Sequence, residues 1–490
     1  MTSFICEDAV EREPHASYCL CQSPAFVRLN ALVEWKFSRR AFLAGMAGLG
    51  AAAFLPKGAS AGIPDAPSGP VAFVNARIFD GKLGSLVENQ RVIVEGNRIA
   101  RIEPDNTGDL ADGVQLIDCG GRTLMPGLID AHWHTMMAAV PMMDLMTADV
   151  GYINLVAAAE AQKTLLRGFT SVRDMAGPSF GLKRAIDSGI NAGPRIWPSG
   201  AMISQTSGHG DFRLPYEVPS ERAAPLSRGE VVNGGAIADG VDEVLKRSRE
   251  QLMLGASQLK LAAGGGVASS YDPIDVAQYT EAEFRAAVDC AENWGTYVAV
   301  HAYTPRAIQT AIRGGVRCIE HGQLMDEETS EIMADKDVWF SSQAFINNEF
   351  ANPYPEGSTN RVKQLTMFAG TDTAFDLARK NKLRTAWGTD ILFQPEMTQN
   401  QGAILASMTR WYSNEEILVM ATSTNAELLA MSGPRNPYPE KLGVVEAEAY
   451  ADLLIVDGNP LADIAIMADP EKNLKVIMKD GRIYKNELPV

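Results

Sequence analysis

Eight short runs of β-branched and apolar residues recur between residues 125 and 390 of this 490-residue chain, and helix-like segments separate them. Strands that alternate with helices predict a parallel sheet, because each helix carries the chain back to the start of the next strand. Eight such units favour an α/β fold of the TIM type, a (β/α)8 barrel. The runs are MPGLIDAHWH (125–134), GFTSVRD (168–174), PRIWPSG (194–200), QLKLAAGG (258–265), YVAVHA (297–302), RCIEH (317–321), VWFSS (338–342) and TAWGTD (385–390).

Two segments between these runs carry signals of their own. The segment 280–294 (TEAEFRAAVDCAENW) is helix-like, and Thr280 and Glu283 have the spacing of a capping box at its start. The section 203–240 is rich in Gly, Pro and Ser and has no clear periodicity. We therefore expect a long loop over the mouth of the barrel there, which is a candidate lid.

Strand-like sequence also lies on both sides of the predicted barrel. VAFVNARIFDG and RVIVEGNRIARIEP precede it, and ADLLIVDGNP and NLKVIMKDGRIY follow it. Their β-branched residues are bounded by Gly, Asn and Asp, as in short strands joined by tight turns. We expect 62–124 and 437–490 to pair into one small β-sandwich domain and 125–436 to form the barrel.

The first 61 residues are predicted to be an export leader outside the fold. Arg39 and Arg40 precede the apolar run 41–55, and the small residues 59–61 follow it. This order is typical of a twin-arginine signal, so we expect cleavage after Ala61 and a periplasmic or secreted protein. No apolar stretch reaches the roughly 20 residues of a membrane helix.

Composition narrows the possible partners. The net charge of −16 opposes binding to nucleic acid or to an anionic membrane surface, because both repel an acidic protein. After the leader only Cys119, Cys290 and Cys318 remain, an odd number that indicates buried thiols and no disulfide framework. We expect a homo-oligomer that acts on a small molecule, with no nucleic acid and no membrane as partner of the mature form.

Polar residues stand at the ends of several predicted strands, where a TIM barrel carries its reacting groups. His132 and His134 share one face of their strand, and Trp133 takes the other face as a packing residue. Neutral imidazoles suit Zn²⁺. Lys260 contributes to a metal site only if it is deprotonated or modified; the alternative is a lysine in a salt bridge. The candidate ligands are His132, His134, Lys260, His301, His321 and Asp390.

Together, PGLIDAHWH, QLKLAAGGG, VAVHAYT, CIEHG and WGTD resemble the metal-dependent amidohydrolase superfamily, and the resemblance extends from Pro70 onward. It implies two Zn²⁺ ions bridged by hydroxide and by N6-carboxylated Lys260. His132, His134 and Asp390 would hold one ion, and His301 and His321 the other. Asp390 would then act as general base and afterwards as general acid.

Two further residues are candidates for contact with the substrate. In similar amidohydrolases a histidine at the position of His209 bonds the substrate carbonyl or the developing oxyanion; the alternative is a loop cap or a hydrogen bond to Asp211. Tyr303 follows His301 by two residues, and the resemblance implies contact with the substrate carboxylate or the tetrahedral oxygen. A tyrosine that packs at the barrel rim is the alternative for Tyr303.

The motifs look most like the branch with imidazolonepropionase-like enzymes, prolidase-like dipeptidases and ochratoxin amidohydrolases. This resemblance implies cleavage of an amide bond to a C-terminal amino acid, in a dipeptide-like substrate with a free carboxylate such as ochratoxin A. Hydrolysis of a cyclic amide or imide is a second hypothesis. A non-catalytic scaffold with the same fold is a third, although no expected metal ligand is missing from the sequence.

Overall fold

The computed structural model describes residues 62–84, 86–106, 108, 110–218 and 225–488, which belong to one compact unit. The predicted leader at 1–61 lies outside the described residues. Within the described ranges, no helix is long and apolar enough to span a membrane.

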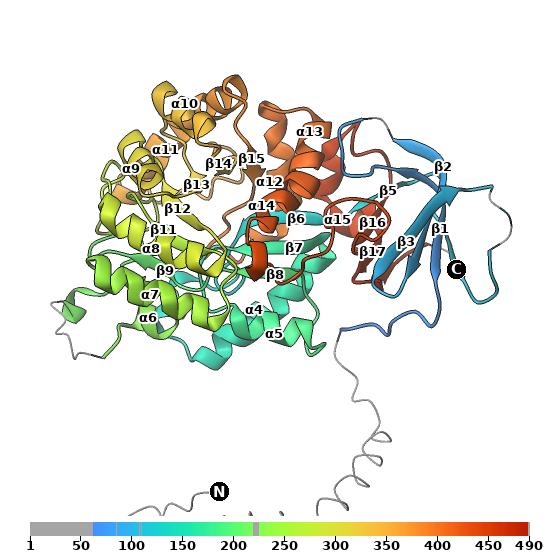
Figure 1. Ribbon diagram of the computed structural model, residues 1–490, viewed down its shortest axis with the longest axis horizontal. Helices are drawn as coiled ribbons and strands as arrows, with labels where there is room; N and C mark the ends of the chain where they lie inside the picture. Colours follow the sequence, from blue (N-terminus) through green and yellow to red (C-terminus); the bar gives the residue numbers. More distant parts are fainter. Residues whose placement is uncertain (1–61, 85, 107, 109, 219–224, 489–490) are drawn as a thin grey trace, which may run out of the picture. The chain divides into compact units, whose positions relative to one another are not determined.

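Parallel strands at the predicted positions form the centre of the fold (Figure 1). They run in two sheets, with the strand orders β6-β7-β8 and β10-β9-β11-β12-β13-β14-β15, and every pair in these sheets is parallel. The strands are β6 (Leu128–Trp133), β7 (Phe169–Asp174), β8 (Arg195–Pro198), β9 (Met202–Ser204), β10 (Gly235–Ile237), β11 (Leu259–Ala262), β12 (Val298–Ala302), β13 (Cys318–His321), β14 (Trp339–Ser342) and β15 (Thr385–Trp387).

The third predicted strand of the barrel is replaced in the structure by two short strands, β8 and β9. β8 ends at Pro198 and pairs with β7, whereas β9 pairs with β11 on the other side. Pro198 has no N–H to continue a ladder, and Gly200 turns the chain with a φ of +74°. The predicted loop 203–240 is also partly regular, since it contains β10 and the short helix α6 (Arg228–Val231).

The first and last strands of the ring, β6 and β15, meet through specific contacts. The backbone N–H of Asp390 donates to the carbonyl of His132 at 2.8 Å. The buried carboxylate of Asp130 accepts from the hydroxyl of Thr389 at 2.7 Å. A Cβ on Gly388 would lie 2.3 Å from the backbone nitrogen of His132, so only glycine allows this close approach.

Helices follow the strands and cover their outer side, as Figure 1 shows for α7 to α9 beside β11 and β12. The capping box expected at Thr280 and Glu283 is confirmed at the start of α8. The remaining helices are α3 (Met142–Thr147), α4 (Val150–Leu166), α5 (Phe180–Asp187), α7 (Val241–Leu254), α8 (Glu281–Trp294), α9 (Pro305–Arg313), α10 (Glu327–Asp335), α11 (Thr359–Lys380), α12 (Gln401–Ala406), α13 (Asn414–Val419), α14 (Asn425–Ala430) and α15 (Pro470–Asn473).

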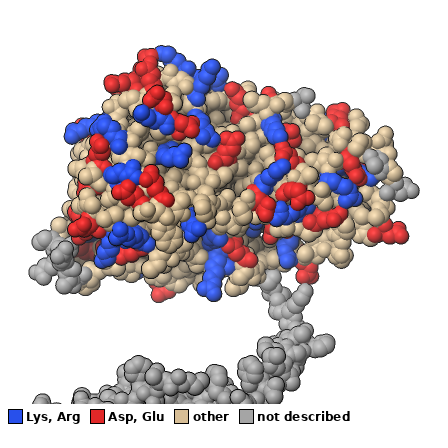
Figure 2. All heavy atoms as spheres, viewed as in Figure 1, with Lys and Arg blue, Asp and Glu red and all other residues tan. Residues whose placement is uncertain are grey.

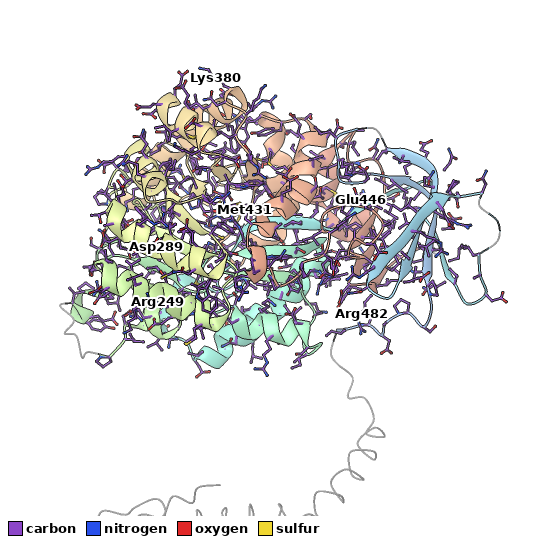
Figure 3. The ribbon with its side chains drawn as sticks, viewed as in Figure 1. Arg249, Asp289, Lys380, Met431, Glu446 and Arg482 are labelled. Atoms are coloured by element: carbon purple, nitrogen blue, oxygen red, sulfur yellow. The ribbon has the colours of Figure 1, made fainter. Side chains whose placement is uncertain are left out.

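Strands from both ends of the described chain pair in one further sheet, in the order β18-β17-β16-β5-β1-β2-β3, with β4 also on β1. Glu446, labelled in Figure 3, forms ion pairs with Lys82 and Lys441 and so ties the returning chain to the first strands. The strands are β1 (Val71–Ile78), β2 (Val87–Glu95), β3 (Arg98–Pro104), β4 (Gln115–Asp118), β5 (Thr123–Pro126), β16 (Leu453–Val456), β17 (Leu474–Lys479) and β18 (Arg482–Asn486).

Apolar side chains fill the space between these layers. Trp133 is buried in the largest core cluster, as expected for a packing residue. The three described cysteines are free and buried, which confirms that they form no disulfide framework. On the face shown in Figure 2, acidic and basic side chains are intermixed, without a large patch of one sign.

Candidate metal centre and active site

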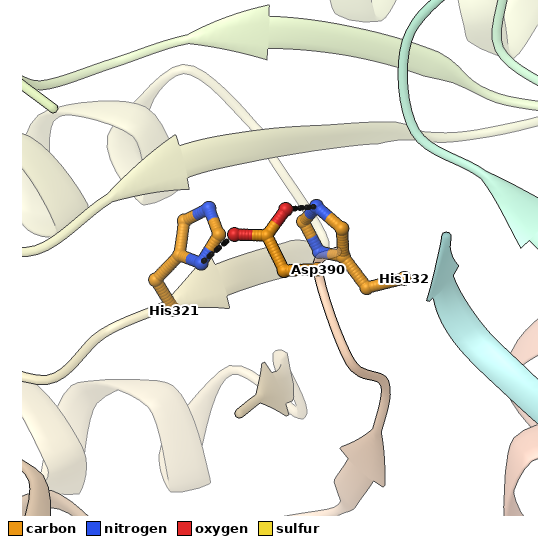
Figure 4. Close-up of side chains that lie close together, drawn as sticks. All are labelled: His132, His321 and Asp390. Atoms are coloured by element: carbon orange, nitrogen blue, oxygen red, sulfur yellow. Dashed lines mark ion pairs between the residues drawn. The ribbon is translucent and has the colours of Figure 1, made fainter. Parts of the chain in front are cut away.

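Three predicted ligands converge where β6 and β15 end. Nε2 of His132 lies 3.1 Å from Oδ1 of Asp390, and Nε2 of His134 lies 3.0 Å from the same oxygen (Figure 4 shows the pair of His132 and Asp390). Both rings are buried, and the carboxylate is nearly so. Two imidazole nitrogens therefore share one carboxylate oxygen in a largely dry site.

The other ring nitrogen, Nδ1, of His132 and of His134 faces an acceptor of its own. Nδ1 of His132 lies 2.7 Å from the carboxylate of Glu320, and Nδ1 of His134 lies 3.4 Å from the carbonyl of Ala176. When Nδ1 of each ring donates to its own acceptor, Nε2 is the nitrogen left to bind a metal ion, whereas without a cation Nε2 can donate to Asp390. Two imidazole nitrogens and a carboxylate oxygen that converge in this way, each ring held by a second partner, fit a metal ion.

His321 completes a group of three whose possible ligand atoms lie within 4.8 Å of one another, together with His132 and Asp390 (Figure 4). Its Nδ1 lies 3.9 Å from Oδ2 of Asp390 and 2.7 Å from Oε1 of Gln343. Both His321 and Asp390 have positive φ values, +78° and +55°. Such backbone strain is common where function fixes a side chain.

His301 lies beside His321, with their ring centroids 4.4 Å apart. Its Nε2 is 3.1 Å from the carbonyl of Gly265, which makes Nε2–H the donor and leaves Nδ1 unprotonated in the neutral ring. Burial lowers the pKa of both histidines well below the usual value and also lowers that of His134. The structure thus favours the neutral form that can bind a metal.

Lys260, from β11, is buried and lines the same cavity as these histidines. Burial lowers its pKa to about 8, although the negative charges of Glu320 and Asp390 oppose that shift. Burial alone would raise the pKa of Asp390, but the surrounding histidines, His132 first, hold it well below the usual value. An amine that loses its proton more readily than an ordinary lysine and an ionised carboxylate therefore face one cavity.

Sequence reasoning missed an ion pair beneath His132. Nη2 of Arg173 lies 2.7 and 2.9 Å from the two oxygens of Glu320, and both side chains are fully buried. Burial would raise the pKa of Glu320, yet Arg173 and then His132 hold it well below the usual value. Two opposite charges inside the apolar runs GFTSVRD and RCIEH are the signal that could have found this pair.

His209 lies at the wall of the cavity and stacks on His301, with ring centroids 3.9 Å apart. Its Nδ1 is 2.8 Å from the hydroxyl of Ser269. The alternative partner, Asp211, is bound instead by Arg213 at 2.6 Å. A Cβ on Gly266 would lie 1.9 Å from Nδ1, so glycine at that position makes room for the imidazole ring.

Tyr303 is buried next to the candidate ligands and is not a rim residue. Its ring centroid lies 4.9 Å from that of His301 and 5.4 Å from that of His321. Burial raises the pKa of its phenol well above the usual value, so the hydroxyl remains a neutral donor. The ring lines the cavity with the predicted ligands.

The cavity above these residues has a volume of about 1440 Å³ when the solvent space at its mouth is included, and most of its wall is apolar. One side comes from α3 and the section 203–240, and another from the segment 344–354 and α11. The apolar and aromatic lining includes Met137, Leu145, Met146, Phe212, Val232, Phe345, Ile346, Phe350, Tyr354, Met367, Phe368 and Phe393.

Comparison with known proteins gives consistent relatives. The model of the amidohydrolase family matches residues 123–484. An ochratoxinase of Aspergillus niger is 31% identical over 389 residues, which are 74% of this chain and 75% of that protein. A prolidase structure complexed with N-methylphosphonate-L-proline has a TM-score of 0.77 and 33% identity, and covers 85% of this chain and 100% of the other. A Xaa-Pro dipeptidase with bound methionine in the active site has a TM-score of 0.72 and 26% identity, with coverage of 85% and 100%.

Proposed function

Because the chain belongs to the amidohydrolase family and is a hydrolase of amide bonds on a TIM-type barrel, we propose that it cleaves the amide bond to a C-terminal amino acid. The observation that carries this proposal is the convergence of His132 and His134 on one oxygen of Asp390, at 3.1 and 3.0 Å. Family membership makes a metal-dependent reaction the expectation, and this donor set suits zinc.

The proposed centre holds two zinc ions. His132, His134 and Asp390 would hold one ion, and His301 and His321 would hold the other. A zinc pair supplies an activated water near neutral pH and polarises a carbonyl oxygen. In His132, His134 and His301 one ring nitrogen faces an acceptor of its own, which leaves the other nitrogen for a metal ion and supports this ligand set.

Lys260 is proposed to join the two halves of the site as a carbamate. The ammonium would lose one proton, and the resulting amine would add CO₂ and lose a second proton, so that a cation becomes an anion on a long arm. The burial of Lys260 among histidines supports this assignment, since a bare ammonium beside metal ions would be costly.

The protein's own groups would then move the proton and orient the substrate. Asp390 would take a proton from the attacking water through a carboxylate oxygen and later give it to the leaving nitrogen. His209 and Tyr303 line the cavity beside His301, where each can donate a hydrogen bond to a substrate oxygen.

The proposed substrates carry a free carboxylate on the leaving side. The relatives support this class, because one is an ochratoxinase and two are named for cleavage beside proline. The apolar cavity supports a large apolar side chain on the C-terminal residue. Ochratoxin A, a phenylalanine amide, is therefore a proposed substrate.

Metal analysis and a substrate screen of the purified protein test this function. We expect about two zinc ions per chain and release of the C-terminal amino acid from N-acyl amino acids, from dipeptides or from ochratoxin A. Zinc with cleavage only of cyclic amides or imides would favour the second hypothesis. A metal-free, inactive protein would indicate a scaffold.

Export and assembly remain proposals from the sequence. Arg39 and Arg40 before an apolar run support transport by the twin-arginine route. N-terminal sequencing of the protein from the producing cells should give a chain that begins after Ala61. Light scattering should show a homo-oligomer.

A further inference from the structure

The cavity over the candidate metal centre has an uneven set of ionisable side chains. Among the described residues that line it, five are histidines and one is Lys260, whereas Asp390 is the single carboxylate. Asp390 already faces His132 and His134. The lining therefore offers several groups to an anion and no free acid to a cation.

Acids just behind the lining are committed to other partners. Asp130 accepts from Thr389 and Gln401, and Asp174 accepts from Thr135 and Ser179.

Two more buried acids in this region are bound in the same way. Glu320 is paired with Arg173. Oδ2 of Asp272 accepts from the N–H of Gly266 at 2.7 Å and lies 3.6 Å from Nδ1 of His209, and its Oδ1 lies 3.9 Å from Nζ of Lys363. None of these four acids lines the cavity. Turning one of these four carboxylates toward the cavity would break its present contacts and would cost the free energy of a buried charge without a partner.

A free dipeptide places its α-ammonium one carbon away from the carbonyl that is cut. The ammonium enters the cavity together with that carbonyl, because the two groups are attached to one Cα. It would thus lie close to the proposed metal ions, in a cavity whose described lining offers it no free carboxylate. The substrate carboxylate lies on the other side of the amide bond, where His209 and Tyr303 can donate to it.

From this asymmetry we propose that the enzyme selects substrates whose acyl end is uncharged and apolar, namely N-acyl amino acids, over dipeptides with a free α-amino group. The inference rests on the proposed function and narrows its substrate class. An acyl group would replace the ammonium with atoms that the apolar walls can cover, including Met146, Phe345 and Met367. An unpaired buried charge would be avoided.

A matched pair of substrates tests this selection with the zinc-loaded enzyme. L-Phenylalanyl-L-phenylalanine and N-(3-phenylpropanoyl)-L-phenylalanine differ only by the α-ammonium group. We expect kcat/KM to be on the order of 100-fold higher for the acyl compound near pH 7. The difference in kcat/KM between the two compounds should decrease above about pH 8, where the α-amine of the dipeptide loses its proton.

The possible outcomes separate this inference from the proposed function. Equal or faster cleavage of the dipeptide would overturn the inference and leave the proposed function intact. Cleavage of neither compound would overturn both. A large preference that does not change with pH would show that the charge of the ammonium is not its cause, and would also overturn the inference.

A pair of variants tests whether the preference for the acyl compound is electrostatic in origin. Gln394→Glu adds an acid to the cavity lining, and Gln399→Glu adds the same charge at an exposed position outside it. The preference for the acyl compound should fall about tenfold in Gln394→Glu and should stay at the wild-type value in Gln399→Glu. Equal preference in the two variants would overturn the inference.

Discussion

The carboxylate of Glu320 lies 2.7 Å from Nδ1 of His132, on the side of the ring away from Asp390. Glu320 is ionised because Arg173 binds both of its oxygens. The hydrogen bond therefore holds a proton on Nδ1 of His132, so that Nε2 is the nitrogen that would bind a metal ion at the candidate centre. A buried ion pair beneath the site thus sets the tautomer of a ligand above it.

Replacing Glu320 should weaken zinc binding. In Glu320→Gln we expect zinc affinity, measured by competition with a chelator, to fall about 10- to 100-fold. Arg173 would lose its partner, so the free energy of unfolding in denaturant should fall by about 3–5 kcal/mol. The double variant Arg173→Leu/Glu320→Leu should regain stability and still bind zinc weakly. Wild-type affinity in Glu320→Gln would contradict the positioning role.

Lys260→Ala should remove the group that is proposed to join the two halves of the centre. We expect about one zinc ion per chain in place of two, and a loss of turnover on the order of 1000-fold. The barrel should still fold, which circular dichroism can check. Added acetate should restore part of the activity by replacing the lost carboxylate. Unchanged turnover and metal content would exclude Lys260 from the site.

Asp390→Asn should separate metal binding from proton transfer. The amide oxygen can still face His132 and His134, so we expect much of the zinc to remain. The amide cannot carry the proton, so kcat should fall by about 10²- to 10⁴-fold. The measurements are metal content and steady-state rates. If turnover survived, another group would have to be the proton carrier.

Tyr303→Phe tests the proposed hydroxyl donor. The ring that packs against His301 and His321 is kept, so folding and zinc content should match the wild type. We expect kcat/KM to fall by about 100-fold if the hydroxyl bonds the developing oxyanion. Wild-type kinetics would leave Tyr303 as a packing residue.

Asp174 should make stability depend on pH. Burial raises the pKa of its carboxyl to about 7, above the roughly 3.9 of an unfolded chain. The folded protein therefore binds this proton more tightly, so the contribution to stability is complete below about pH 4 and is lost as pH rises through 7. Relative to Asp174→Asn, the wild type should lose up to about 4 kcal/mol of unfolding free energy between pH 4 and 8. Parallel pH profiles of the two proteins in urea would contradict this assignment.

The candidate ligands at the strand ends could be predicted because each strand is indicated by residues that are neighbours in the sequence. Alternation along MPGLIDAHWH puts His132 and His134 on one face, and the barrel hypothesis then places Lys260, His301, His321 and Asp390 at the same end. β9 and β10 were missed because each has three residues, too few for a period to appear. The contact of Glu320 with His132 joins positions 188 residues apart, and no local pattern encodes such a pairing.

The meeting of β6 and β15 has a consequence for how the centre comes into being. His134 and Asp390 are 256 positions apart in the chain, and they become neighbours only when the last strand closes against the first. A growing chain that stops before residue 390 thus lacks an anionic ligand, however well its earlier units fold. The proposed proton carrier therefore reaches the site only when the last strand is in place, so a chain that ends earlier cannot complete the hydrolysis.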